Sequence, residues 1–279
     1  MKRFLNILLV LALVAGLSLL LYPTVSDYWN SLHASQAVAS YDQAVKSMDE
    51  GKYDELLQRA GQYNRDLFLR GSLFSLTDEE REDYNSQLDI DGSGVMGYIE
   101  IPTIKVSLPI YHGTSDDVLQ VAVGHLEWSS LPVGGESTHA VLSAHRGLPT
   151  AKLFSDLDLM QVGDRFTIYT LNQALTYQVD QITVILPEEI EALAIEPGKD
   201  YVTLMTCTPY AVNTHRLLVR GVRVPDDAPT PEPESEPEKE PLDARRLLQN
   251  VVLPATAGIL FVIMTVLLLK VVRGGRRKK

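Results

Sequence analysis

Three residues of different chemical types could together carry out acyl transfer: Cys207, His145 and Arg216. Cys207 is the only cysteine of the chain and ends the β-prone run 203–207, whose sequence is TLMTC. His145 ends another β-prone run, 139–145, and Arg216 begins a third one, nine residues after the cysteine. A thiolate is a strong nucleophile, and a neighbouring histidine can exchange its proton and later protonate the leaving amine. A guanidinium stays charged, so it suits binding of a carbonyl oxygen or of the oxyanion that forms from it.

Strand geometry predicts how these residues come together. Side chains alternate between the two faces of a strand, so Thr203 lies on the face of Cys207 and Thr206 on the opposite face. Both threonines are candidate residues of a substrate pocket. If residues 208–215 join two neighbouring antiparallel strands, Cys207 and Arg216 lie close together at one rim of the sheet.

The TLMTC run resembles the TLxTC signature of sortases, which are transpeptidases of Gram-positive cell surfaces. The segment 142–147, LSAHRG, and Arg216 fall where this family places its histidine and its arginine. The sequence of these segments resembles class C, the pilin-polymerising sortases, and the matching segments lie close together over residues 95–224. Further matching segments are 97–102, 108–114, 124–126, 130–135 and 152–157.

This resemblance implies a function. We expect Cys207 to attack the LPxTG-type sorting signal of a pilin subunit and to form a thioester. His145 then exchanges the proton, Arg216 holds the substrate backbone and the oxyanion, and a lysine amine of the next subunit releases the product. The expected partners are pilin subunits, with hand-over to a wall-anchoring sortase as a further step. This chemistry requires no cofactor and no metal.

Two other functions explain less of the pattern. One is a sortase that anchors surface proteins to peptidoglycan, but the second apolar segment and the class C-like sequence around Pro132 and Gly147 argue against it. The other is a non-catalytic, membrane-anchored pilus scaffold, which leaves the coincidence of cysteine, histidine and arginine unexplained. An acceptor-competition assay separates the first alternative, and a thiol probe separates the second.

The catalytic region is expected to be mainly β. Short β-prone runs separated by Gly, Pro, Asp and Asn follow one another over residues 95–224, which predicts a closed barrel or a sandwich. The resemblance implies the closed eight-stranded β-barrel of sortases. Upstream, residues 24–70 carry apolar residues at helical spacing with a break at Gly51, which predicts a helical stalk or cap.

Residues 71–94 are polar and weakly patterned, so they are expected to form a long, lid-like loop. In class C sortases a lid with an Asp-Pro-aromatic motif covers the catalytic cysteine. The nearest match here is Ser72-Leu73-Phe74, in which Phe74 supplies a ring while the Asp and the Pro are both absent. Ser72 and Phe74 are therefore lid candidates, and the missing carboxylate predicts a weakly closed site. The alternative is that Phe74 packs on the surface.

Apolar segments lie at both ends of the chain. Segment 1–23 contains an apolar stretch, 4–22, of about the 20 residues that span a bilayer, preceded by Lys2 and Arg3, so it is expected to be an uncleaved anchor. Segment 251–272 is a second predicted span, followed by a basic tail, 273–279. A Pro/Glu-rich linker, 225–250, precedes it. The positive-inside rule then predicts a membrane protein with both termini in the cytoplasm and the catalytic domain outside.

Residues 253–257, LPATA, resemble a sorting signal at the start of the second span. The favoured interpretation is an ordinary membrane helix with a proline in its first turn, and the alternative is that the enzyme is itself processed or anchored to the wall. Composition excludes other classes: the formal charge of −11 argues against nucleic acid as a partner. A single cysteine permits neither an intramolecular disulfide nor a multi-cysteine zinc site.

Overall fold

The structure is a computed structural model that describes residues 2–71 and 75–225. Residues 2–26 belong to one compact unit and residues 27–225 to another. The helices and strands, in chain order, are α1 (Lys2–Lys46), α2 (Glu50–Arg70), α3 (Asp78–Ser86), β1 (Val95–Ile101), η1 (Pro102–Ile104), β2 (Val106–His112), α4 (Asp116–Leu119), β3 (Val123–His125), β4 (Thr138–Ser143), η2 (Leu157–Leu159), β5 (Arg165–Thr170), β6 (Gln173–Ile185), η3 (Ile190–Leu193), β7 (Asp200–Thr208) and β8 (His215–Arg223).

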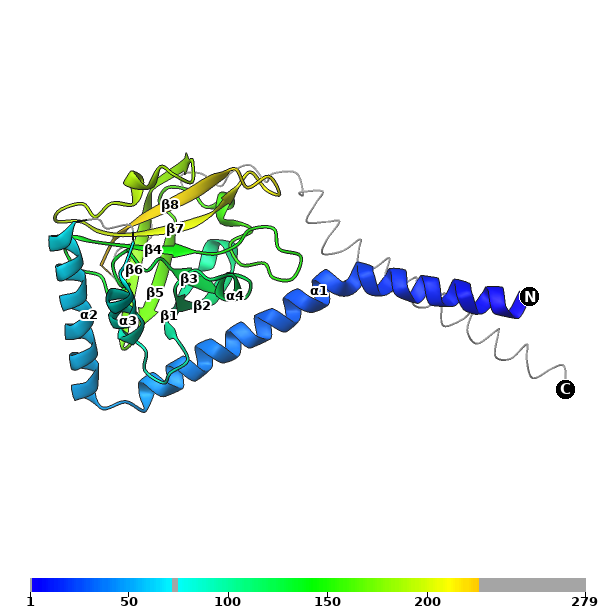
Figure 1. The fold of residues 1–279 in the computed structure, drawn as a ribbon, viewed down its shortest axis with the longest axis horizontal. Coiled ribbons are helices and arrows are strands. Elements are labelled where there is room, and N and C mark those ends of the chain that lie inside the picture. Colours follow the sequence, from blue (N-terminus) through cyan, green and yellow to red (C-terminus); the bar gives the residue numbers. More distant parts are fainter. Residues whose placement is uncertain (1, 72–74, 226–279) are drawn as a thin grey trace. The chain divides into compact units, whose positions relative to one another are not determined.

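The eight strands close into one barrel in the order β1-β2-β3-β4-β7-β8-β6-β5 (Figure 1). The pairs β2–β3 and β4–β7 are parallel, whereas the other six pairs are antiparallel. Closure leaves no exposed sheet edge. The predicted closed eight-stranded barrel is therefore confirmed.

The interior of the barrel is filled by alternate side chains of the strands. On β5, Phe166 and Ile168 are fully buried, and Phe166 stacks on Tyr177 of β6 with ring centroids 5.7 Å apart. Gly221 of β8 makes room for this pair, because a Cβ at that position would lie 2.7 Å from the Phe166 ring. The β-prone runs that predicted strands thus pack into one core.

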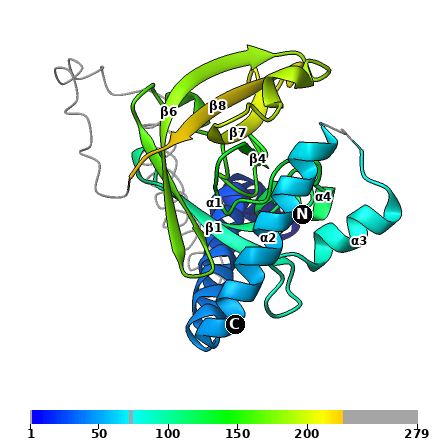
Figure 2. The same cartoon turned by 90° about the vertical axis from the view of Figure 1, so that its left-hand side faces the viewer.

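Helix α2 packs lengthwise on this barrel (Figures 1 and 2). Its buried residues recur at spacings of three and four, which places them on one helical face. The buried side chain of Asn64 adds specificity, since it donates to the carbonyl oxygen of Leu131 at 3.0 Å and accepts from its N–H at 2.7 Å. The apolar residues of this face are Leu56, Ala60, Tyr63 and Leu67.

The later part of α1 also packs on the barrel. The hydroxyl of the buried Tyr41 donates to the carbonyl oxygen of Met96 at 3.1 Å and accepts from the N–H of Leu171 at 2.8 Å. This single side chain therefore connects the helix to β1 and to the β5–β6 turn.

Nearer its start, α1 contacts the loop that follows β4. The Asp27 carboxylate accepts from the N–H of Lys152 at 2.7 Å, and the Asn30 amide donates to the carbonyl oxygen of Thr150 at 2.8 Å. Two backbone groups of this loop are thus held by one helical turn.

Residues 71–94 do not form a loop throughout, so the prediction of a long loop was wrong. They contain α3, whose start is fixed by a capping box: the Thr77 hydroxyl accepts from the Glu80 N–H, and the Glu80 carboxylate accepts from the Thr77 N–H. This reciprocal pair satisfies backbone donors that a polar nine-residue helix could not otherwise satisfy. Three acidic residues in the first turn also favour the helix, because they complement its dipole.

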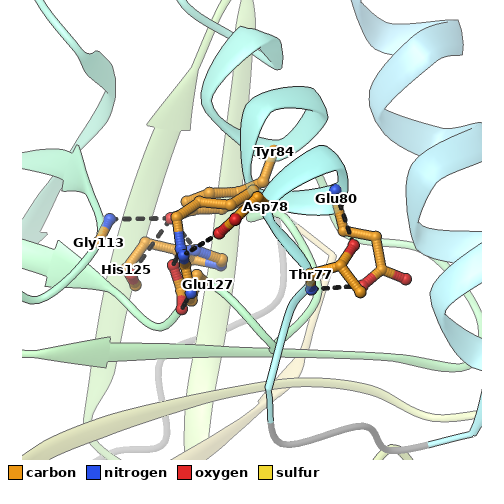
Figure 3. Close-up of polar contacts among 8 residues, drawn as sticks. Thr77, Asp78, Glu80, Tyr84, Gly113, His125 and Glu127 are labelled. Atoms are coloured by element: carbon orange, nitrogen blue, oxygen red, sulfur yellow. Dashed lines mark hydrogen bonds and ion pairs between the residues drawn. The ribbon is translucent and has the colours of Figure 1, made fainter.

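Tyr84 connects α3 to the barrel through hydrogen bonds (Figure 3). Its hydroxyl lies 2.9 Å from Nδ1 of His125 and accepts from the N–H of Gly113 at 2.9 Å. Nε2 of His125 lies 2.7 Å from the carbonyl oxygen of Ser130, which can only accept, so Nε2 carries the proton and Nδ1 accepts from Tyr84. Complete burial lowers the pKa of His125 to about 4, which keeps the imidazole neutral.

One helix in the described part of the chain is long and apolar enough to cross a membrane, namely the segment Phe4–Lys46, and its most apolar window is exposed. The second predicted span at 251–272, the tail 273–279, the LPATA segment and the linker beyond Pro225 lie outside the described residues. The expectation of two spans therefore stays a prediction.

Candidate active site

Cys207 and Arg216 are directly opposite each other on the antiparallel pair β7–β8. Residues in such a register have their side chains on one face, with Cβ atoms about 5 Å apart. The connection is shorter than expected, because His215 already belongs to β8. Cys207 is a free cysteine and is partly exposed.

His145 is placed beside this pair by the parallel pairing of β4 with β7. β4 ends at Ser143, two residues before the position expected from the sequence. Ser143 is paired with Met205, and the N–H of Ala144 still donates to the carbonyl oxygen of Met205 at 3.2 Å. His145 directly follows Ala144, and counting two positions on from the Ser143–Met205 pair leads to His145 on one segment and Cys207 on the other.

The Cys207 and Arg216 side chains share the outer face of the barrel. Val141, Met205 and Leu218 form a separate apolar cluster on that face. Cys207 lies two residues after the second of these on β7, and Arg216 lies two residues before the third on β8. Because alternation keeps even spacings along a strand on one face, this cluster lies next to the proposed nucleophile and the arginine.

Arg216 is held from its own loop. Its Nη1 lies 3.2 Å from the carbonyl oxygen of His215 and 3.4 Å from that of Asn213. Among residues 2–71 and 75–225, no carboxylate forms an ion pair with it. The guanidinium therefore retains donors for a substrate oxygen.

A groove of about 270 Å³ lies along β6, β7 and β8 beside η3, and Cys207, His145 and Arg216 are not among its lining residues. Thr203 is one of its lining residues, although the threonine itself is buried and its hydroxyl lies 2.7 Å from Nε2 of His139. Thr206 lies on the interior face, where its hydroxyl donates to the carbonyl oxygen of Ala144 at 2.8 Å. In this structure Thr206 connects the two strands of the site, and a direct role of either threonine in substrate binding stays a prediction.

The lid candidates Ser72 and Phe74 lie outside the described residues. The sequence interpretation missed the helix that follows them and its Tyr84–His125 contact. The signal for the helix start was present, because Thr77 and Glu80 have the spacing of a capping box. The contact itself joins residues 41 positions apart and has no local signal.

Comparisons with known proteins agree with this geometry. Residues 99–224 match the family model described as "Sortase domain". The crystal structure of sortase C1 from Streptococcus agalactiae is similar at 56% identity with a TM-score of 0.68, over 69% of this chain and 100% of that chain. A sortase C from Streptococcus pneumoniae, whose structure is described as informing pilin substrate specificity, is similar at 46% identity and a TM-score of 0.63, over 70% of this chain and 99% of that chain.

Among curated proteins, Sortase A of Streptococcus agalactiae serotype III (strain NEM316) is 33% identical over 129 residues, which are 45% of this chain. The match spans about half of that relative, 51% of its length. The similar solved structures are covered almost completely, and they include class C sortases. The chain therefore belongs to the sortase family, whose members are membrane-associated cysteine transpeptidases.

Proposed function

We propose that this protein polymerises pilin subunits at the outer face of the cell membrane. The observation that carries the proposal is the cross-strand pair of Cys207 and Arg216 beside His145, in a barrel 56% identical to a sortase C1. The partners are pilin subunits with LPxTG-type sorting signals, and a wall-anchoring sortase is the expected recipient of the finished polymer. Two membrane spans with both termini in the cytoplasm would keep the barrel at the site of assembly.

The reaction has two transfers. In the first, the Cys207 sulfur bonds to the carbonyl carbon of the Thr-Gly-type bond while the carbon–nitrogen bond breaks, and His145 takes the thiol proton and passes it to the leaving amine. Arg216 donates to the carbonyl oxygen while it carries negative charge. In the second, a lysine amine attacks the thioester, His145 removes its proton, and the thiol is released.

Mass spectrometry on the full chain in detergent micelles tests the first transfer. Incubation with an LPxTG-type peptide is expected to add the mass of the acyl fragment to Cys207, and Cys207→Ala should show no adduct. A wild-type protein that stays unmodified at saturating peptide would contradict the proposal.

An acceptor competition separates polymerisation from wall anchoring. The acyl enzyme is offered equal concentrations of a pilin-derived peptide containing one lysine and of a peptidoglycan-type peptide amine. The proposal predicts an isopeptide product with the lysine peptide. A product formed only with the wall-type amine would instead support the anchoring enzyme.

A further inference from the structure

A second arginine, Arg146, lies between the segments that carry the histidine and the cysteine. It directly follows His145, and its side chain is only 9% exposed. Its Nη2 forms an ion pair with the carboxylate of Asp158 on η2, and its Nη1 makes a long hydrogen bond of 3.5 Å to the hydroxyl of Thr208. Thr208 is the residue after Cys207, so one guanidinium reaches from the neighbour of the base to the neighbour of the nucleophile.

The loop after β7 packs on the same group. The Tyr210 ring lies 5.7 Å from the Arg146 guanidinium carbon, which is within the range of a cation–π contact. Tyr210 also covers Gly147: a Cβ there would lie 2.9 Å from the ring, and the φ of +76° independently favours glycine. The His145 segment, η2 and the β7–β8 loop therefore meet at Arg146.

His145 needs such support because it lies outside the strand ladder. β4 ends at Ser143, and although the N–H of Ala144 still donates to the carbonyl oxygen of Met205, the strand ladder ends before His145. The backbone contact of His145 itself is a bond from the N–H of Phe154 to its carbonyl oxygen at 3.2 Å. Because this bond does not involve β7, side-chain contacts must set the position of His145 relative to that strand.

We propose that Arg146, held by Asp158, is a positioning residue that sets the separation of His145 and Cys207. The inference rests on the proposed roles of those two residues. A planar guanidinium can bind a carboxylate, contact a hydroxyl and stack on a ring at once, whereas an ammonium group cannot. A displacement of about 1 Å between catalytic groups can cost about a hundredfold in rate.

The test compares kcat and KM for an LPxTG-type peptide in full-length variants. Arg146→Lys keeps the charge but loses the planar group, so kcat should fall about ten- to a hundredfold while KM stays within about twofold. Arg81→Lys is the matched control, because Arg81 forms a two-bond pair with Glu127 at 3.0 and 3.2 Å on α3. The control should keep the wild-type kcat.

Asp158 provides a second, independent perturbation. Asp158→Asn should reproduce the loss of kcat, and Asp158→Glu, which restores a carboxylate, should recover most of it. Thermal unfolding of each variant shows whether it is folded at the assay temperature. A loss of kcat in folded Arg146→Lys and Asp158→Asn, with recovery in Asp158→Glu, supports positioning.

Two results overturn the proposal. One is an Arg146→Lys protein that keeps kcat within about twofold, and the other is a loss of kcat no greater than that of Arg81→Lys. Both are distinct from failure of the proposed function, in which the wild type itself would form no acyl adduct on Cys207.

Discussion

Tyr63 of α2 and Tyr84 of α3 are both buried, but the hydrogen-bond partners of their hydroxyl groups differ. Tyr84 and Tyr63 have ring centroids 6.4 Å apart, and their exposed fractions are 0% and 5%. The Tyr84 hydroxyl bonds to His125 and Gly113, as Figure 3 shows. The Tyr63 hydroxyl is buried and has no hydrogen-bond partner within the part of the chain that the structure describes.

Removing the two hydroxyls should therefore have different effects. Tyr84→Phe leaves Nδ1 of His125 and the N–H of Gly113 without partners, and each orphaned group costs about 1–3 kcal/mol, together about 2–6 kcal/mol. Tyr63→Phe removes a hydroxyl that already lacks a partner, so the free energy of unfolding should change by less than about 0.5 kcal/mol or increase.

Urea unfolding of the full chain in micelles, followed by circular dichroism, measures both values. The comparison is valid when the two variants keep the wild-type dependence of unfolding free energy on urea. Equal destabilisation by the two substitutions would refute the reasoning, because ring packing rather than hydrogen bonding would then be the cause. A loss below about 0.5 kcal/mol in Tyr84→Phe would refute it as well.

Three further predictions concern the pH dependence of stability, the role of Arg216 and the contact between Gly147 and Tyr210. The pKa of about 4 for His125 lies below the value of about 6.5 in an unfolded chain, so between these pH values the unfolded state binds one more proton. The free energy of unfolding should therefore be about 3 kcal/mol higher above pH 6.5 than at pH 4, and this part is lost as the pH falls. His125→Gln should remove that part of the pH dependence of urea stability, and an unchanged slope would contradict it. Arg216→Lys should lower kcat/KM about 10²- to 10³-fold in the peptide assay, since the planar donor is lost; a tenfold loss or less argues against an oxyanion role. Gly147→Ala should cost about 1–3 kcal/mol of stability, and adding Tyr210→Ala should recover part of it, because the new Cβ meets that ring. If the double variant does not recover stability, the positive φ of Gly147 alone accounts for the loss.

Local patterns predicted the parts of the site that are neighbours along the chain. Cys207 and Arg216 belong to consecutive strands joined by a short loop, so alternation and turn residues were enough to pair them. The short β-prone runs separated by turn residues left a barrel and a sandwich open, and the family resemblance implied the closed barrel. For α3 a local signal existed, but the polar composition hid it because a helix with little apolar surface resembles a loop.

The position of His145 could not be derived in this way. It depends on the parallel pairing of β4 with β7, whose residues are about 60 positions apart, and parallel neighbours leave no turn signature between them. The same holds for Arg146, since its contacts with Asp158 and Thr208 come from two other segments. Such long-range contacts are set by packing of the whole barrel, which no local window contains.

The contacts of Asp27 and Asn30 with the loop after β4 decide where the protein can be shortened. Deleting the apolar start of α1 is the direct route to a water-soluble enzyme, and a cut just before residue 27 leaves both contacts intact. A cut a single helical turn later would free the backbone of Thr150 and Lys152, five and seven residues after His145. The shortened protein could then keep its barrel and still differ in activity from the membrane-bound enzyme, so kinetic constants from differently truncated proteins are comparable only when this helical turn is retained.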